Sequence, residues 1–509
     1  MARFRGRSGG RPLSLALVAT FALACGGGPA EPTGDDIEAG GETTVEVVRE
    51  LPREPPPESG PRQDLAFPAI VRDQLRSGLE VNTVRTGQLP VVYLRLVVRS
   101  GDASDPDDLP GLAGLVADML KEGTSNRSSA ELAEDVEFLG ARLSVGTDEE
   151  NLYVMIRALA EHLPRAMTIL ADVVRRPAFD ARELRRLVRR EQDRLALRRS
   201  DPRWLARRVF YRELYGAHPY AHVDTTDEAL GRVRSRHLER WHRDHVRPNN
   251  AFLVAVGDVD PTEVQELANR AFRGWQERRV EEPTYADPPA RSERQVVVVN
   301  RPGSTQSVIY VGNLALARSN EDYVPLLVAN QVLGGSASSR LFMDLRERRS
   351  LTYGAYSSIG ERVQVAPFLA FAAVPNASTE AALEGFVEHL EQIVEEAPPP
   401  DELQAAQTFI ADKFPLEIET AGRIAYMVEQ LRSFGLPDDY WDTYRTSIRD
   451  VTADEAFAAA RAYIHPAEAL VVAVGEASEI VEPLRRYGPV RVEDTDGEVI
   501  ETFEAAPAD

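Results

Sequence analysis

The sequence predicts an α+β fold made of two homologous domains, and two observations carry this prediction. First, residues 246–257 read VRPNNAFLVAVG, and residues 464–475, 218 positions further along, read IHPAEALVVAVG. Each segment is a proline-containing turn followed by a buried strand that ends at glycine. Second, the length of 509 residues exceeds one domain and suits two of about 200–220 residues plus extensions. An internal duplication accounts for both observations.

The expected elements follow the same order in both halves. An apolar run at residues 91–98 predicts a strand before a helical pattern at 112–122, and residues 307–311 precede a helical pattern at 323–333 in the same way. Strands mixed with helices predict a layered α+β domain in each half. Further helices are expected at residues 129–139, 163–174, 183–199, 338–346 and 379–394.

The N-terminus has the pattern of a targeting signal. Four arginines within the first eleven residues precede an apolar run at residues 13–22, which is too short to span a membrane. The run leads to Cys25, the only cysteine, and three glycines, and this segment resembles the cleavage box of bacterial lipoproteins. We therefore expect lipidation of Cys25 and a place in the cell envelope, at the outer membrane facing the periplasm. The alternative is an ordinary secretory signal with an incidental cysteine.

The expected domain plan has five parts. The segment after Cys25 is rich in Gly, Pro and Glu and poor in aromatic residues, which is typical of a flexible tether. A polar stretch at residues 281–293 marks the boundary between the two domains. The parts are a signal peptide at 1–24, a tether at 25–62, an N-terminal domain at 63–285, a C-terminal domain at 286–492 and an acidic tail at 493–509.

Residues 111–124 read GLAGLVADMLKEGT and contain a metal-binding motif that lacks its ligands. With histidine, glutamate and histidine at positions 114, 117 and 118, this stretch would be the zinc helix H-x-x-E-H. Here these positions are Gly114, Ala117 and Asp118. The flanking residues, the duplication and the length together resemble peptidase family M16, the pitrilysin- and insulinase-like enzymes, in its short two-domain branch. The resemblance implies two homologous M16-type α+β domains that form half of a clamshell.

The chemistry of the family motif is lost at these positions. A zinc hydrolase needs three protein ligands, an open position for water and a carboxylate that accepts the water proton. Gly114 and Ala117 remove one ligand and the base, and Asp118 cannot hold a metal alone. The resemblance places the third ligand on a later helix, where neither Glu191 nor Asp193 aligns convincingly, so the correspondence of Glu191 stays open. We expect no zinc, no other cofactor and no catalytic residue in this chain.

Two groups of histidines are candidates to replace the lost ligands. His237, His242 and His245 lie close together, and helical spacing allows the last two to meet. The segment resembles an ordinary helix-to-strand passage of the family, which favours a structural role. His218 and His222 lie in YGAHPYAH, which resembles a non-ligating family stretch and favours loop packing.

The second half contains a candidate substrate-binding pair. Residues 345–354 read LRERRSLTYG. The resemblance implies that an arginine and a tyrosine at this spacing hold the substrate backbone near the scissile carbonyl, and here they are Arg346 and Tyr353. A guanidinium and a phenol suit this task because both donate hydrogen bonds to carbonyl oxygens and to developing negative charge. The alternative is that both residues only pack the turn, with Arg346 paired to Glu347.

Loss of the metal motif with retention of this pair resembles the non-catalytic chain of heterodimeric M16 peptidases. We therefore expect a zinc-free subunit that pairs with an H-x-x-E-H chain, closes the peptide chamber and contributes Arg346 and Tyr353 to the partner's site. Zinc is expected only in that partner, and the substrates are expected to be extended peptides. The net charge of −22 argues against nucleic acid as a partner.

Three alternatives stay open. The first is a stand-alone peptide-binding pseudoenzyme lipoprotein that has no catalytic partner. The second is a structural role like that of the core subunits of the respiratory bc1 complex, which the lipoprotein signal disfavours. The third is an independent enzyme with a different metal site, which would require metal in the purified protein and a role for His242 or Asp118.

Overall fold

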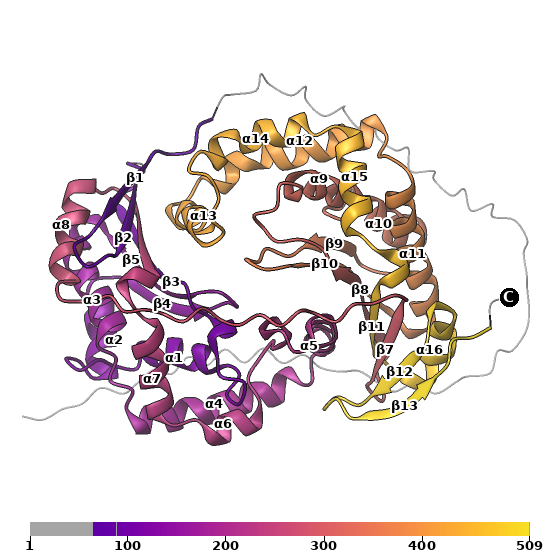
Figure 1. Cartoon of the computed structure of the whole chain (residues 1–509), viewed down its shortest axis with the longest axis horizontal. Coiled ribbons are helices and arrows are strands. Elements are labelled where there is room, and N and C mark those ends of the chain that lie inside the picture. The colour runs from indigo at the N-terminus through magenta and orange to yellow at the C-terminus, as the bar shows by residue number, and fades with distance from the viewer. Residues whose placement is uncertain (1–64, 88, 508–509) are drawn as a thin grey trace, which may run out of the picture. The chain divides into compact units, whose positions relative to one another are not determined.

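Two β-sheets of matching strand order form the centre of the chain (Figure 1). The computed structural model describes residues 65–87 and 89–507. The first sheet contains β1 (Ile70–Gln74), β2 (Glu80–Arg85), β6 (Ala251–Gly257), β3 (Val91–Val98), β5 (Leu152–Leu159) and β4 (Arg142–Thr147), in this spatial order. The second contains β13 (Val499–Phe503), β12 (Val490–Glu493), β7 (Gln295–Asn300), β11 (Leu470–Gly475), β8 (Gln306–Leu314), β10 (Pro367–Pro375) and β9 (Ala355–Ile359).

The two sheets repeat one topology. The order β2-β6-β3-β5-β4 of the first sheet recurs as β7-β11-β8-β10-β9 in the second. In both, the series begins with a parallel pair and continues with antiparallel pairs. The two repeated sequence segments form β6 and β11, which take the same place in their sheets. The predicted α+β class and the internal duplication are therefore confirmed.

Helices flank both sheets. Those of the first half are α1 (Leu112–Leu120), α2 (Ser129–Phe138), α3 (Leu163–Arg175), α4 (Ala181–Arg198), α5 (Pro202–Tyr215), α6 (Asp227–Arg232), α7 (Ser235–His245) and α8 (Pro261–Ala271). Those of the second half are α9 (Tyr323–Leu333), α10 (Arg340–Phe342), α11 (Thr379–Glu395), α12 (Pro400–Glu417), α13 (Ala421–Ser433), α14 (Tyr440–Asp450), α15 (Ala453–Tyr463) and α16 (Ala477–Leu484). The strand expected at 91–98 and the helix expected at 323–333 have the same bounds in the structure.

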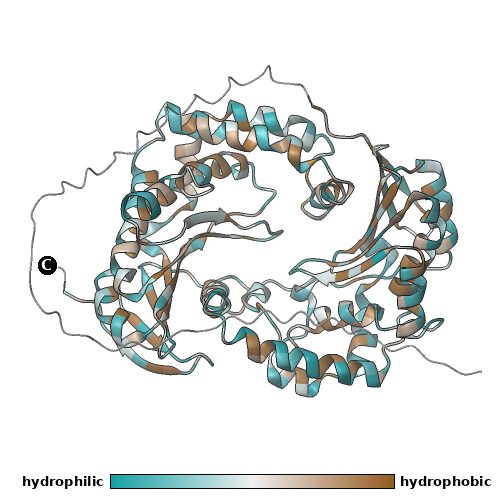
Figure 2. Ribbon diagram, turned by 180° about the vertical axis from the view of Figure 1, so that it is seen from behind, coloured by the Kyte–Doolittle hydropathy of each residue, from teal (hydrophilic) through white to brown (hydrophobic). Residues whose placement is uncertain are grey.

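Each sheet is buried on both faces. Along β3, Leu94 and Leu96 pack into the core that α1 and α3 cover, whereas Val97 packs into a separate core on the opposite face. All residues of β6 are buried, which explains its unbroken apolar sequence. Figure 2 shows this arrangement: the strands are hydrophobic, and the helices around them are hydrophilic on their outer sides.

The two halves exchange one helix each. Helix α5 belongs to the first half of the sequence, but it packs on β7, β8 and β11 of the second sheet. Helix α13 belongs to the second half and packs on β3 and β6 of the first sheet (Figure 1). Neither sheet is therefore covered on both faces without the other half, and the two halves fold as one body within Asp64–Asp509.

Buried ion pairs accompany this exchange. Arg95 on β3 donates through Nη2 to Glu429 of α13 at 2.9 Å, and both side chains are almost completely buried. Arg212 of α5 donates through Nη2 to Glu493 of β12 at 2.6 Å. Each pair joins an exchanged helix to a strand of the sheet that it covers.

The C-terminal segment differs from expectation. Residues 493–509 were predicted as an acidic tail, but β13 forms within them and pairs antiparallel with β12. The apolar residues Val499, Ile500 and Phe503 among the acidic ones supply a strand that extends the second sheet.

Two predictions concern membranes. The expected signal peptide, Cys25 and the tether lie outside the described residues. Within residues 65–87 and 89–507, no helix has the length and apolar character that crossing a membrane requires.

Candidate functional site

Helix α1 holds the three positions of the degenerate metal motif. It begins after Gly111, which has a φ of 83° and lies so close to Thr225 that a Cβ atom would approach the Thr225 Cβ to 2.6 Å. Gly114 leaves space beside β4, since a Cβ added there would have Thr147 Oγ1 at 3.6 Å as its nearest neighbour. Ala117 is buried in the core, and Asp118 reaches the surface with 26% of its side chain exposed.

An arginine lies beside the motif, where the family motif would bring a metal. Arg194 of α4 donates through Nη1 to Oε1 of Glu191, and the same Nη1 lies 4.0 Å from Oδ2 of Asp118. Arg198 lies 3.7 Å from the second oxygen of Glu191. Asp118 also pairs with Lys121 at 2.7 Å. The carboxylates that could ligate a cation are therefore neutralised by side-chain cations of the same chain.

This pairing continues along the interface between α1 and α4. Glu122 is buried, and its two carboxylate oxygens accept hydrogen bonds from Arg186 at 2.7 Å and Arg190 at 3.1 Å. These arginines hold the pKa of Glu122 below its usual value in spite of the opposing effect of burial. Asp118 of α1 and Glu122, just after the end of α1, thus face a basic side of α4, which stabilises the packing of this segment on α4.

Two of the candidate histidines, His242 and His218, are held by hydrogen-bonding contacts with the backbone. His242 is partly buried, its Nε2 lies 2.7 Å from the carbonyl oxygen of Val174, and burial lowers the pKa of its imidazole to about 4. His245 stacks against Trp241 with a ring separation of 4.8 Å. His218 is buried and accepts a hydrogen bond at Nδ1 from the backbone N–H of Tyr220. His222 lines a separate cleft. No group of three metal-ligating side chains occurs in the described part of the chain.

Arg346 lies within an irregular helical turn, and Tyr353 follows that turn. The helix expected at 338–346 consists of α10 and a π-helical turn, Met343–Arg348, and Arg346 lies in that turn. Its guanidinium lies 4.7 Å from the ring centre of Phe342 and 3.5 Å from Glu347. Its side chain is 44% exposed, so neither neighbour covers it. Single π-helical turns occur often at functional sites because they re-aim side chains.

Tyr353 is presented directly to solvent. It is 92% exposed, and its hydroxyl makes no hydrogen bond within residues 65–87 and 89–507. The backbone before it is fixed, because Thr352 donates through Oγ1 to the carbonyl oxygen of Ala373 at 2.7 Å. Ser350, between the two residues of the pair, has a φ of 54°, which a non-glycine residue seldom adopts. A rigid, strained turn therefore presents an exposed phenol that contributes nothing to packing.

A network of partly buried acids beside the first sheet joins the two halves of the chain. Glu150 follows β4, accepts a hydrogen bond from the Tyr220 hydroxyl, and accepts a second from the backbone N–H of Val363 at 2.7 Å. Its neighbour Glu149 pairs with the buried guanidinium of Arg362. Burial raises the pKa of Glu150 to about 7, and burial together with the charge of Glu149 raises that of Asp102 to about 7.

Sequence reasoning missed the arginines of α4 and this buried network. A signal for the arginines exists, because residues 186, 190, 194 and 198 repeat at the four-residue spacing of one helix face. Asp118 on α1 and Glu122, just after its end, have the same spacing and the opposite charge. The network has no comparable signal, since its members come from four separate parts of the chain.

Comparisons with known proteins agree with the fold and the motif. Residues 81–214 match the family model of the insulinases (peptidase family M16), and residues 232–409 match the model of the peptidase M16 inactive domain. The uncharacterized zinc protease YmxG of Bacillus subtilis is 23% identical over 289 residues, 57% of this chain and 69% of that protein. The non-peptidase homolog YmxG of Helicobacter pylori is 24% identical over 371 residues, 72% of this chain and 85% of that protein.

A solved structure gives the same result for the fold. The crystal structure of a peptidase M16 inactive domain from Pseudomonas fluorescens aligns with a TM-score of 0.74 at 24% identity and covers 80% of this chain and 98% of that one. The duplicated α+β fold and the degenerate helix define a protein of the two-domain zinc peptidase type. The chain belongs to peptidase family M16, and it has the features of a non-catalytic member because the motif ligands and the base are absent.

Proposed function

We propose that the chain is the non-catalytic, zinc-free subunit of a heterodimeric M16-type metallopeptidase. In this proposal it pairs with an H-x-x-E-H chain, closes the peptide chamber and places Arg346 and Tyr353 beside the partner's zinc site. The observation that carries the proposal is the contrast between the two halves. The ligands of the metal motif on α1 are lost and Asp118 lies beside Arg194, whereas Tyr353 is 92% exposed and Arg346, which contacts Phe342 and Glu347, keeps 44% of its side chain exposed.

The chemistry of the pair suits an active site that another chain completes. Zinc in the partner would polarise the scissile carbonyl and activate a water molecule. Arg346 would donate from its exposed guanidinium to the carbonyl oxygen on which negative charge develops, and the Tyr353 hydroxyl would donate to a neighbouring backbone carbonyl. An extended peptide would be held by adding a strand to a sheet edge, and β4 is an edge strand that lies beside α1.

The name of the Helicobacter pylori relative supports the non-catalytic part of this proposal, and the zinc protease names of other relatives support a peptidase context. We further propose that Cys25 anchors the subunit at the outer membrane, facing the periplasm. The envelope location would give the complex access to peptides outside the cytoplasm.

Purification of the native protein in mild detergent tests the pairing. We expect a companion of similar size with an H-x-x-E-H motif and about one zinc per pair, identified by mass spectrometry and metal analysis. A metal-free protein that elutes alone, or as a homodimer, would contradict the heterodimer and would favour a peptide-binding pseudoenzyme.

Substitution of Arg346 tests the shared site in the assembled complex. Arg346→Ala should lower kcat/KM for peptide cleavage by about 10²-fold, the scale for loss of one charge-stabilising donor. The matched control is Arg348→Ala, which removes an exposed arginine two positions away that pairs with Asp344 at 3.6 Å. An unchanged kcat/KM for Arg346→Ala, or an equal loss in the control, would contradict a role for Arg346 in the partner's site.

A further inference from the structure

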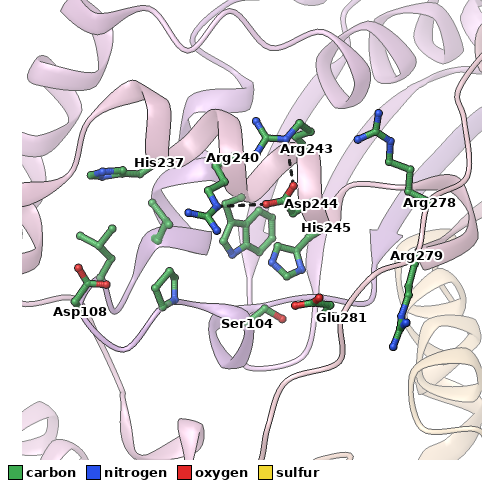
Figure 3. A pocket seen from close by; sticks show the side chains of 14 residues that line it. Ser104, Asp108, His237, Arg240, Arg243, Asp244, His245, Arg278, Arg279 and Glu281 are labelled. Carbon is green, nitrogen blue, oxygen red and sulfur yellow. Dashed lines mark hydrogen bonds and ion pairs between the residues drawn. The ribbon is translucent and has the colours of Figure 1, made fainter.

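A cleft of about 680 Å³ lies beside the start of α1, and its lining includes none of Gly114, Ala117, Asp118, Arg346 and Tyr353 (Figure 3). It is bounded by α7, by the loop before α1, and by residues 278–281 of the segment between the domains. We call it the arginine cleft, because Arg240 and Arg243 of α7 and Arg278 and Arg279 of that segment line it. Its volume lies in the range of sites for small molecules or short peptide segments.

The positive charges of the cleft are only partly neutralised. Asp244 is the carboxylate that serves both α7 arginines, at 3.6 Å from Arg240 and 3.2 Å from Arg243. Neither Arg278 nor Arg279 has an ion pair within the residues that the structure describes. Figure 3 shows Asp244 between Arg240 and Arg243, with Arg278 and Arg279 on the right and the acidic residues Asp108 and Glu281 lower in the view. Within the described residues, Arg278 and Arg279 are therefore the two arginines of the cleft that have no carboxylate partner.

The charges of the neighbouring residues also favour an anion in the cleft. Burial and the neighbouring charge of Arg278 lower the pKa of Arg247, which follows α7. Like charges at close range repel, so Arg278 and Arg279, which are adjacent in the chain and have no ion pair in its described part, favour an anion beside them. Such a cluster is notable in a chain whose net charge is −22.

An aromatic surface lies beneath the arginines. Trp241 is 3% exposed, and its Nε1 is buried with no hydrogen-bond partner in the described part of the chain. The Nδ1 atom of His245, whose ring lies against that of Trp241, is also buried without a hydrogen-bond partner in this part of the chain. Burial lowers the pKa of His245, so its imidazole is neutral at pH 7. The indole N–H is a donor, which suits an oxygen acceptor rather than a cation.

We propose that the arginine cleft is a binding site for a ligand with two or more oxyanion groups, carboxylates or phosphates. Guanidinium groups bind both kinds of oxyanion through paired hydrogen bonds, and several arginines around one cleft favour a multiply charged ligand. The two sources of this chemistry are an acidic peptide segment and a small phosphate compound. This inference is independent of a catalytic partner, because every residue of the site belongs to this chain.

Titration of the full-length chain in detergent tests the site. The probes are octaglutamate and pyrophosphate, with octalysine as the probe of opposite charge, and the readouts are calorimetry and tryptophan fluorescence. We expect binding of octaglutamate, pyrophosphate or both, and none of octalysine. Arg278→Ala/Arg279→Ala should weaken that binding by about tenfold or more, because each charge-assisted hydrogen bond contributes at least about 1.5 kcal/mol.

The matched control removes two arginines elsewhere. Arg182→Ala/Arg185→Ala changes the net charge equally at exposed positions of α4 and should leave binding unchanged. Trp241→Phe should abolish the ligand-dependent change in fluorescence while retaining the aromatic floor. Binding of one probe alone would identify its source, peptide or phosphate. No binding of either probe, equal weakening in both double variants, or an unaltered fluorescence change in Trp241→Phe would overturn the proposal.

Discussion

Oδ2 of Asp118 lies 4.0 Å from Nη1 of Arg194, and that same nitrogen donates to Glu191. Asp118 occupies a ligand position of the family motif, and Glu191 is a buried acid of α4. One guanidinium therefore lies between a ligand position of the family motif on α1 and a carboxylate of α4. The site has been rebuilt around an internal ion pair, and restoring the motif alone would leave that ion pair in place.

We expect that the variant Gly114→His/Ala117→Glu/Asp118→His binds zinc only weakly, because Glu191 stays engaged by Arg194. Adding Arg194→Ala should free Glu191 as the third ligand and give about one zinc per chain. Position 114 has room for the new side chain, since Thr147 Oγ1 is the nearest atom to a Cβ there. Metal analysis after gel filtration in buffer with trace zinc measures the difference.

The control for this comparison adds Arg189→Ala to the triple variant in place of Arg194→Ala. Arg189 lies on the exposed side of the same helix. Stoichiometric zinc in the triple variant, or an equal gain from either added substitution, would show that Arg194 does not keep the site closed.

The ion pair between Arg95 and Glu429 predicts an asymmetry between single and double substitutions. Arg95→Ala would leave a carboxylate of which 5% is exposed without its partner, at a cost of about 3–5 kcal/mol in the free energy of unfolding. Replacing both residues by methionine should cost less than either single change to alanine, because no charge is then left buried. Urea unfolding followed by fluorescence measures all variants. A double variant that is less stable than both single variants would contradict the argument.

The buried carboxyl of Glu150 predicts a specific dependence of stability on pH. Burial raises its pKa from 4.5 to about 7, so the folded chain binds this proton more tightly than the unfolded chain does. Its contribution to stability is therefore present in acid and is lost as the pH rises from about 4.5 through about 7. Glu150→Gln keeps a neutral acceptor for Val363 and does not titrate. The unfolding free energy of the variant relative to the wild type should rise by about 1 kcal/mol or more between about pH 5 and pH 8.5.

Thermal or urea unfolding at a series of pH values checks this prediction. Taking the difference from the wild type cancels the titration of histidines such as His242, whose lowered pKa acts in the opposite direction. Glu161→Gln, at an exposed position, is the control and should give a flat difference. A flat difference for Glu150→Gln as well would mean that burial does not raise this pKa.

The parts of the fold that local pattern determines could be predicted from the sequence. β3 and α9 have the expected bounds, because hydrophobic period and turn residues act over a few positions. The exchange of α5 and α13 could not be predicted, because an amphipathic helix indicates that it packs but not which sheet it covers. β13 was missed for a related reason, since its pairing with β12 outweighs an acidic local composition.

Some features of the candidate site could likewise be predicted from the sequence, and others could not. Gly114 and Ala117 have no side chain that could bind a metal or accept a proton, and this is evident from the sequence alone. The neutralisation of Asp118 by Arg194 depends on the packing of α1 against α4 across about 75 residues, which only the arrangement of the two helices reveals. The exposure of Tyr353 likewise follows from the turn at Ser350 and not from the tyrosine itself.

The proposed membrane anchor predicts a change of compartment from one substitution. Cys25 is the only cysteine, so fatty-acid labelling of the chain reports on this residue alone. Cys25→Ala should abolish labelling and move the protein from the membrane fraction to the soluble envelope fraction, because buried acyl CH₂ groups contribute about 0.8 kcal/mol each to membrane binding. Cell fractionation with immunodetection measures the shift, and Ala30→Ser, outside the cleavage box, should leave both labelling and location unchanged. Retention of the Cys25→Ala variant on membranes would show that another part of the chain, or a partner, holds it there.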